Sequence, residues 1–228
     1  MHSSAMLYGR KFFETYCLPA QTEKLTVVEI GSQNVNGSLR DVCPRGVRYI
    51  GLDFVEGKDV DIVLNDPYRL PLDDGAADVV VSSSCFEHSE FFWLLFLEAM
   101  RILVPGGLFY LNVPSNTNIF HRYPVDCWRF NPDASCALAS WGKRNGHDVV
   151  LLESFIGKLS IEIAPCLGWH DFVAIFLKGS DQLERHTSRM HDSLEGVFNI
   201  HRHGSDDVIN PLTFGGDAIL IEYLARSL

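Results

Sequence analysis

The feature that most constrains the fold is a series of short apolar runs in which polar residues do not alternate. A strand that is buried on both faces has this pattern, and Ala77–Ser83 (ADVVVSS) is the clearest case. Amphipathic stretches lie between the runs, so the sequence predicts an α/β protein with a mostly parallel sheet. The expected strands are Leu25–Ile30, Val47–Asp53, Val60–Leu64, Ala77–Ser83, Leu108–Val113, Val149–Phe155 and Phe172–Leu177.

Four stretches have the composition of helices. They are Leu7–Leu18, Ser89–Leu103, Asn131–Arg144 and Ala218–Leu228. In the second, Ser89 suits a helix start and Pro105-Gly106-Gly107 a stop before the fifth strand. Its Phe91–Leu97 segment (FFWLLFL) is apolar on every side, which indicates core packing and leaves a homodimer contact open.

Length and composition indicate one soluble domain. With 228 residues, 46% hydrophobic and 21% charged, the chain is globular, and we expect a core over residues 25–178. The polar, His-rich residues 179–228 are expected to form an appendage of the same domain that covers the pocket or contacts a partner subunit.

The net charge of −10 disfavours nucleic acid and anionic membranes as partners. Six scattered cysteines without CxxC spacing favour a reduced, cytoplasmic protein.

Two strand ends carry the first functional signal. The first strand runs into Gly31, where the backbone must turn at the ligand-binding edge of such a sheet. Gln33 and Val35 break the GxGxxG pattern, which disfavours a dinucleotide loop, although Asn34 and Asn36 tolerate left-handed backbone. Asp53 ends the next strand, 22 positions later, where a carboxylate can accept ribose hydroxyls. A helix cap or surface position is the alternative for Asp53.

Several further motifs follow in a fixed order. They are Asn65-Asp66-Pro67, Leu70-Pro71-Leu72-Asp73-Asp74, Ala77-Asp78-Val79-Val80-Val81, Glu87-His88, Glu98 with Arg101 and Leu103, and Pro105-Gly106-Gly107. Together with the two strand ends, they resemble class I S-adenosylmethionine-dependent methyltransferases, in particular the small-molecule, methyltransferase type 11-like group. The resemblance implies a Rossmann-like, three-layer α/β/α fold. Its sheet would have seven mostly parallel strands, with the last strand antiparallel.

The same resemblance implies S-adenosyl-L-methionine as cofactor and S-adenosyl-L-homocysteine as product. Glu29 and Gly31 would face the methionine moiety, Asp53 would hold the ribose, and Asp66 with Pro67 would lie beside the adenine. Ser83 and Ser84 would line the methionine end. The full set of implied cofactor residues is Glu29, Gly31, Ser32, Asn34, Asp53, Phe54, Asp66, Pro67, Ser83 and Ser84.

His88 follows the fourth strand and is our first candidate for a general base, because imidazole titrates near neutral pH. The alternative is that His88 caps or packs the following helix. His121 and Asp126 are further candidates for base and orienting group.

The segment that contains them, Asn116–Arg129, follows the fifth strand and mixes aromatic, basic and acidic residues suited to a polar small molecule. The expected substrate residues are His88, His121, Arg122, Tyr123, Trp128 and Arg129. A loop packed over the core, with Arg122 paired to Asp126, is the structural alternative. We expect no metal ion, because the tail residues His186, His191, His201, His203, Asp206 and Asp207 suit a solvated segment.

The sequence thus predicts methyl transfer to a small-molecule acceptor, with a hydroxyl of a sugar, glycan precursor or natural product as the expected target. A non-catalytic cofactor-binding relative is one alternative. A nicotinamide-dependent oxidoreductase is another, and the absence of GxGxxG argues against it.

Overall fold

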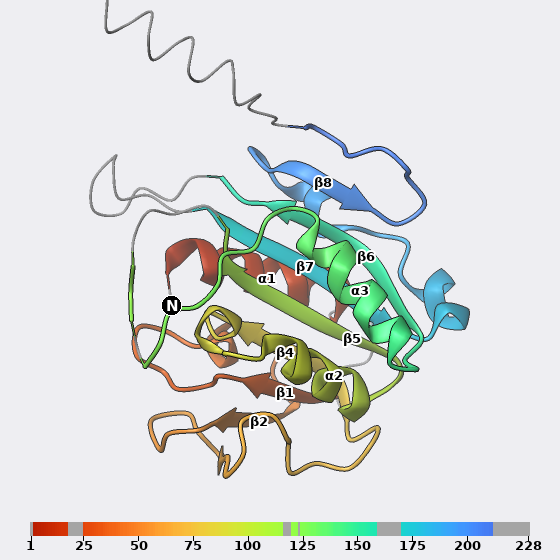
Figure 1. Cartoon of the computed structure of the whole chain (residues 1–228). Helices are drawn as coiled ribbons and strands as arrows, with labels where there is room; N and C mark the ends of the chain where they lie inside the picture. The colour runs from red at the N-terminus through yellow and green to blue at the C-terminus, as the bar shows by residue number, and fades with distance from the viewer. Residues whose placement is uncertain (1, 18–24, 116–119, 123, 159–169, 212–228) are drawn as a thin grey trace, which may run out of the picture.

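One twisted eight-stranded sheet organises the computed structural model, which describes residues 2–17, 25–115, 120–122, 124–158 and 170–211. The strand order is β3-β2-β1-β4-β5-β7-β6-β8 (Figure 1). The strands are β1 (Thr26–Ile30), β2 (Arg48–Asp53), β3 (Ile62–Val63), β4 (Ala77–Ser83), β5 (Leu103–Pro114), β6 (Val149–Ile156), β7 (Asp171–Lys178) and β8 (Phe198–Arg202).

Strands β1 to β5 run parallel, and β7 pairs antiparallel with both β5 and β6. The predicted fold class is therefore confirmed, but the expected number of seven strands is wrong. The eighth strand, β8, comes from the tail and pairs antiparallel with β6. The sequence of β8, FNIHR, includes His and Arg, and most of its residues are partly exposed at the sheet edge. Because of this composition, the sequence indicated a polar tail at this point and not a strand.

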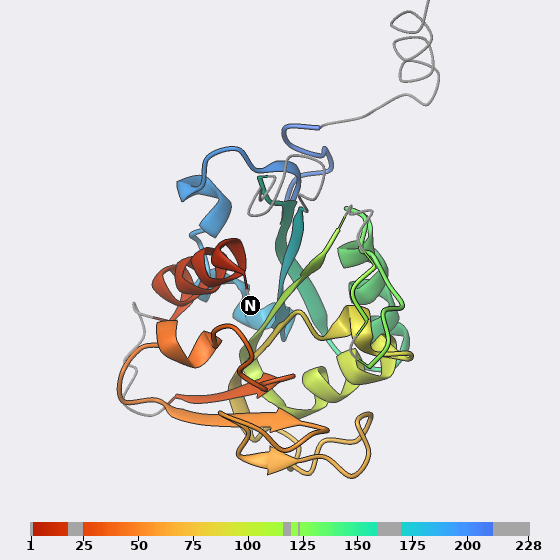
Figure 2. The ribbon, with the colours of Figure 1, turned by 90° about the vertical axis from the view of Figure 1, so that its left-hand side faces the viewer.

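Helices cover both faces of the sheet, which gives the three expected layers (Figures 1 and 2). Helix α1 (Ser3–Tyr16) packs on one face, where Phe12 and Phe13 are fully buried. Helices α2 (Phe92–Ile102) and α3 (Ala134–Arg144) pack on the other. Short 3-10 turns complete the described helices: η2 (Leu39–Val42), η3 (Phe86–His88), η4 (Ser180–Arg185) and η5 (Met190–Ser193).

The α2–β5 junction differs from the prediction. Helix α2 begins at Phe92, not Ser89, and no side chain caps its first turn. It ends at Ile102, and β5 starts directly at Leu103, so Pro105-Gly106-Gly107 lies inside the strand and does not stop the helix. The extra residues form a bulge, because the β4–β5 register shifts between Ala77 and Val79.

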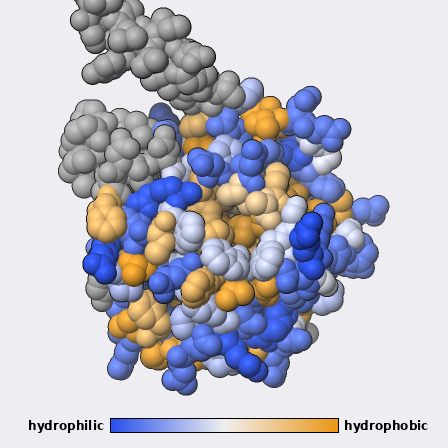
Figure 3. Space-filling model, viewed as in Figure 1, coloured by the Kyte–Doolittle hydropathy of each residue, from blue (hydrophilic) through white to orange (hydrophobic). Residues whose placement is uncertain are grey.

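The apolar segment at the start of α2 is only partly core. Leu95 and Phe96 are buried, whereas Phe91 and Leu94 are 46% and 39% exposed. Figure 3 shows this side of the molecule, where hydrophobic side chains lie among hydrophilic ones near the centre of the view. Core packing accounts for the inward half of the segment, and the homodimer stays a prediction.

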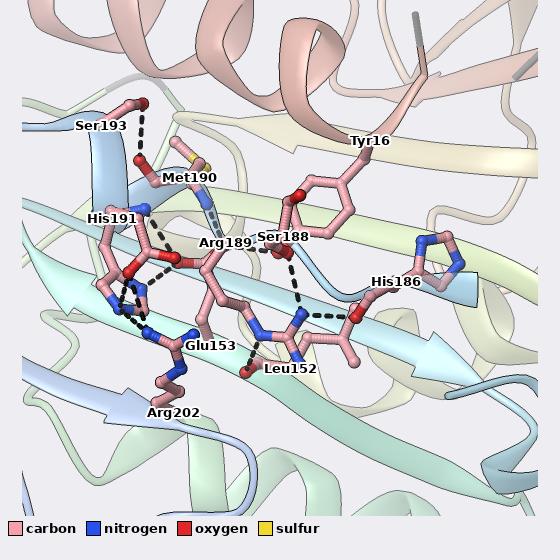
Figure 4. Close-up of polar contacts among 11 residues, drawn as sticks. Tyr16, Leu152, Glu153, His186, Ser188, Arg189, Met190, His191, Ser193 and Arg202 are labelled. Atoms are coloured by element: carbon pink, nitrogen blue, oxygen red, sulfur yellow. Dashed lines mark hydrogen bonds and ion pairs between the residues drawn. The ribbon is translucent and has the colours of Figure 1, made fainter. Parts of the chain in front are cut away.

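Besides the β8 pairing, a buried carboxylate on β6 connects the tail to the sheet. Glu153, on β6, accepts hydrogen bonds from the Tyr16 hydroxyl (2.5 Å), the Met190 amide (2.7 Å), and the His191 amide (3.1 Å) and Nδ1 (2.5 Å) (Figure 4). Arg189 donates to the carbonyl of Leu152 beside it. The tail through β8 is thus continuous with the core on the α1 face. The helix expected at Ala218–Leu228 lies outside the described residues.

No helix in the described part of the chain combines the length and apolar character needed to cross a bilayer. The cytoplasmic location stays a prediction from cysteine usage.

Candidate active site

The turn that leaves β1 forms the first wall of the site. Gly31 has φ +80°, and its amide and that of Ser32 both donate to the Leu52 carbonyl, which ties the turn to β2. A Cβ at Gly31 would lie 2.6 Å from Cys85 Cβ, so this position excludes a side chain on both conformational and steric grounds. Glycine at this turn therefore lets the backbone pack against Cys85, and the contact of this turn with a ligand stays a prediction.

Asp53 fastens the same turn from the end of β2. Its carboxylate accepts the Gln33 amide at 3.0 Å and the Val55 amide at 3.2 Å, and the residue is 7% exposed. Each oxygen has a further lone pair available for a ligand donor. Asp53 is thus neither a helix cap nor a surface residue, and both of those alternatives are excluded.

The variant part of the glycine loop is held by Asn34. Its side chain donates to Asp59 (2.6 Å) and accepts from the Gly37 amide (2.9 Å). Positive φ angles occur at Gly31 and Gly37 and not at Asn34 or Asn36, so asparagine does not replace glycine in left-handed backbone here. Asn34 instead stabilises the loop through its side-chain hydrogen bonds.

Glu29 lies beneath this loop. It is buried, and its Oε2 accepts the Tyr49 hydroxyl at 2.8 Å. Burial raises the pKa of Glu29 to about 7, while Tyr49 and Arg40 oppose the shift.

Buried polar side chains line the ends of β4 and β5. Ser84 has φ +52°, which is a strained conformation. It is stabilised by a hydrogen bond from the Ser84 amide to the Asn112 carbonyl (2.9 Å). Ser32 Oγ, Ser83 Oγ and Asn112 Oδ1 are buried and have no hydrogen-bond partner among the described residues. Such atoms are rare in native proteins and indicate a place where a ligand or water completes the bonding.

Directly after β4, η3 places Glu87 and His88 at the same edge. Glu87 is 1% exposed, and its Oε2 has no partner within the described ranges. Burial raises the pKa of Glu87 to about 8, with Arg129 opposing the shift. His88 Nδ1 lies 2.5 Å from the Val125 carbonyl and does not cap α2, and burial lowers the pKa of its ring.

The segment after β5 closes over η3. The amides of Cys127 and Trp128 both donate to the Glu87 carbonyl, and Trp128 Nε1 donates to the Ser89 carbonyl. Asp126 binds Arg129 through both oxygens, and this bond lowers the pKa of Asp126 to about 2. The structural alternative, in which Arg122 pairs with Asp126, is wrong in this pairing, since Arg122 donates to the Pro124 carbonyl. The low pKa of Asp126 suits an orienting group and not a base.

The structure brings most of the predicted residues to one edge but leaves some apart. Asp66 heads an exposed turn, in which its Oδ1 accepts the Tyr68 amide, and Pro67 and Phe54 are exposed beside the loops. Tyr123 lies outside the described residues. Glu87 and Asn112 were missed as site residues, although a carboxylate next to His88 after a buried strand was a readable signal for the first.

Residues 17–111 match the family model described as "Methyltransferase domain". This segment includes β1 to β4 and most of β5, and therefore the ends of β1, β2 and β4 described above, but not the end of β5. The match covers 95 of the 228 residues and confirms the resemblance to methyltransferases that was drawn from the sequence. The methyl donor expected from this resemblance is S-adenosylmethionine.

Solved structures with similar folds share little sequence with this chain. The 1,6-didemethyltoxoflavin-N1-methyltransferase of Burkholderia thailandensis is 14% identical (TM-score 0.54), with 78% of this chain and 79% of that one aligned. A SAM-dependent methyltransferase from Archaeoglobus fulgidus is 19% identical (TM-score 0.51; 76% and 94%). The YcgJ protein of Bacillus subtilis is 12% identical (TM-score 0.56; 78% and 99%). At these identities the likeness establishes the fold alone. A search of curated proteins gives no significant match.

Proposed function

We propose that this methyltransferase transfers the methyl group to an oxygen of a small polar acceptor that binds between η3 and the segment after β5. The observation that carries the proposal is the cluster of Glu87, His88, His121, Asp126 and Arg129 at the edge where β4 and β5 end. Charged and imidazole groups at this edge suit hydrogen bonding to hydroxyls, as expected for a sugar, glycan precursor or natural product.

The cofactor would lie across the ends of β1, β2 and β4. Asp53 has lone pairs for the two ribose hydroxyls, and the turn at Gly31, beside it at the same sheet edge, would lie next to the methionine moiety. Ser83 Oγ, which has no partner in the described structure, would be satisfied by the methionine end. Asp66 and Pro67 remain our prediction for the adenine side.

The main contribution of the protein to methyl transfer is to align the acceptor oxygen, the methyl carbon and the sulfur. The acceptor oxygen forms a bond to the methyl carbon while the carbon–sulfur bond breaks and its electron pair stays on sulfur. The hydroxyl proton is released at the Glu87–His88–His121 cluster, which has proton-accepting groups that the cofactor lacks. Arg129 fixes Asp126, and Asp126 in turn accepts the His121 amide at 2.9 Å, so the acceptor would meet an ordered wall.

Binding and turnover test the proposal separately. Calorimetry with S-adenosylhomocysteine measures binding at the cofactor site. Turnover is measured as the release of S-adenosylhomocysteine from S-adenosylmethionine in the presence of three acceptor classes: polyols and glycosides, phenols, and carboxylic acids. We expect binding and hydroxyl-dependent turnover. Cofactor binding with no turnover on any class would support the non-catalytic alternative. A thermal shift with NAD and none with S-adenosylmethionine would contradict the methyltransferase assignment.

A further inference from the structure

Two histidines face the same oxygen of a buried carboxylate. His88 Nε2 lies 3.7 Å and His121 Nε2 3.9 Å from Glu87 Oε1. One ligand atom from each of the three residues lies within 4.8 Å of the other two. The histidines come from different parts of the chain, η3 and the segment after β5, so the fold itself brings them together.

Each of the two imidazole rings has a protein oxygen near its Nδ1 atom, on the side away from Glu87. The Val125 carbonyl, 2.5 Å from His88 Nδ1, requires the proton on Nδ1 and leaves the Nε2 lone pair directed at Glu87. His121 Nδ1 faces Asp126 Oδ2 at 3.7 Å, and Asp126 is itself held by Arg129. For His88, this hydrogen bond is the arrangement by which proteins fix the tautomer and direction of metal-binding histidines, and Asp126 is placed to do the same for His121 once the two residues move closer.

Hydrogen bonding does not account for the cluster. The contacts of 3.7 and 3.9 Å exceed the range of a hydrogen bond, and Glu87 Oε2 has no partner among the residues that the structure describes. The carboxylate is 1% exposed, and one of its oxygens therefore has no donor, while an imidazole nitrogen of each histidine lies within 4 Å of the other oxygen. A cation among the three atoms would compensate this arrangement.

We propose that Glu87, His88 and His121 form a binding site for one divalent first-row transition-metal ion, with Zn²⁺ as the reference ion. Two imidazoles and one carboxylate favour such ions over Mg²⁺ or Ca²⁺, which prefer oxygen ligands. Metal–ligand bonds of about 2.0–2.1 Å place tetrahedral ligands roughly 3.4 Å apart, so the contacts to Glu87 need to close by only a few tenths of an ångström. The expectation of no metal considered only the tail histidines.

The metal site also limits the chemical class of the methyl acceptor, and this part of the inference rests on the proposed function. Three protein ligands leave at least one coordination position open toward the segment after β5. An acceptor with two adjacent oxygens, such as a vicinal diol, would bind there, and the ion would lower the pKa of the bound hydroxyl so that its proton passes to solvent. With the ion bound, His88 and His121 are ligands, so the proton-accepting role given to the cluster under the proposed function applies only to the metal-free protein.

Metal binding is measured on the full chain without any acceptor. The protein is stripped with a chelator, and Zn²⁺ is titrated by calorimetry while the visible spectrum of bound Co²⁺ reports the ligand set. We expect one equivalent per chain. Glu87→Gln, His88→Gln and His121→Gln should each weaken binding by about 100-fold or more, and Asp126→Asn by roughly 10- to 100-fold. The exposed His203→Gln serves as the matched control and should bind like the wild type.

Affinity for S-adenosylhomocysteine and thermal melting are followed in the same variants. Retained cofactor binding and melting show that a loss of metal affinity reflects the ligand set and not the fold. Less than one equivalent of metal in the wild type, or equal losses in His203→Gln, would overturn the metal site and leave the cofactor site untouched. Failure of the wild type to bind S-adenosylhomocysteine would instead contradict the methyltransferase site.

Discussion

Glu153 and Glu87 are both buried carboxylates beside histidines, yet their surroundings are opposite. Glu153 accepts four hydrogen bonds, from Tyr16, Met190 and His191, and the His191 ring lies at 2.5 Å. Glu87 has histidine contacts only at 3.7 and 3.9 Å and one oxygen without a partner in the described structure. The complete hydrogen-bond network of Glu153 stabilises the fold. The incomplete network of Glu87, at the sheet edge, indicates a ligand-binding site.

The largest effect is expected from removal of the completed network. Glu153→Ala would leave the Tyr16 hydroxyl and the His191 ring buried without their acceptor, and should lower the free energy of unfolding by about 3–5 kcal/mol. Urea denaturation followed by circular dichroism measures this. A loss below about 1 kcal/mol would contradict the structural role of Glu153.

Asp53 stands between the two extremes, because each of its oxygens accepts one backbone amide and has room for more. Asp53→Asn should weaken S-adenosylhomocysteine binding by about 1.5–3 kcal/mol, or roughly 10- to 100-fold, through the loss of charge-assisted bonds to the ribose. Calorimetry measures the change, with the exposed Asp73→Asn as control. Unchanged affinity would remove Asp53 from the cofactor site.

The matching change in the incomplete cluster should hardly affect stability. In the metal-free protein at pH 7, the raised pKa keeps Glu87 mostly protonated, and its Oε2 has no described partner, so Glu87→Gln should change the free energy of unfolding by less than about 1 kcal/mol. The same denaturation experiment serves. A destabilisation as large as that of Glu153→Ala would show that Glu87 is structural.

The smallest effect is expected at Ser83. Its Oγ is buried without a described partner, so Ser83→Ala should alter the free energy of unfolding by no more than about 0.5 kcal/mol. Cofactor affinity should fall by about 0.5–1.5 kcal/mol if the hydroxyl binds the methionine end. Thermal melting and calorimetry separate the two. A stability loss with full affinity would reverse this interpretation.

The sequence predicted those parts of the fold that depend on local pattern. Ala77–Ser83 was predicted to the residue, because a continuous apolar run defines a central strand, and Gly31 and Asp53 follow from the position of strand ends. The α2 start was misplaced by three residues, because Ser89 has cap chemistry but lies in the turn after η3. Local preference does not determine such boundaries when tertiary bonds hold the backbone.

The parts that could not be predicted depend on contacts between distant residues. Strand β8 exists because β6 offers it an edge, and its own five residues, FNIHR, give only a short alternation that does not stand out in a polar tail. The role of Glu153 depends on Tyr16, 137 residues away, and that of Glu87 on His121 beyond the next strand. In the candidate site, the sequence identified the chemistry of His88, His121 and Asp126, but not which groups share one oxygen.

The central claim is that the ends of β1, β2 and β4 hold the methyl donor beside the Glu87 cluster. A crystal structure of the complex with S-adenosylhomocysteine tests it most directly. We predict the ribose hydroxyls within hydrogen-bond distance of Asp53, and the sulfur on the side of the ligand that faces Glu87 and His88. A nucleoside bound elsewhere, or a sulfur directed away from this cluster, would contradict the account.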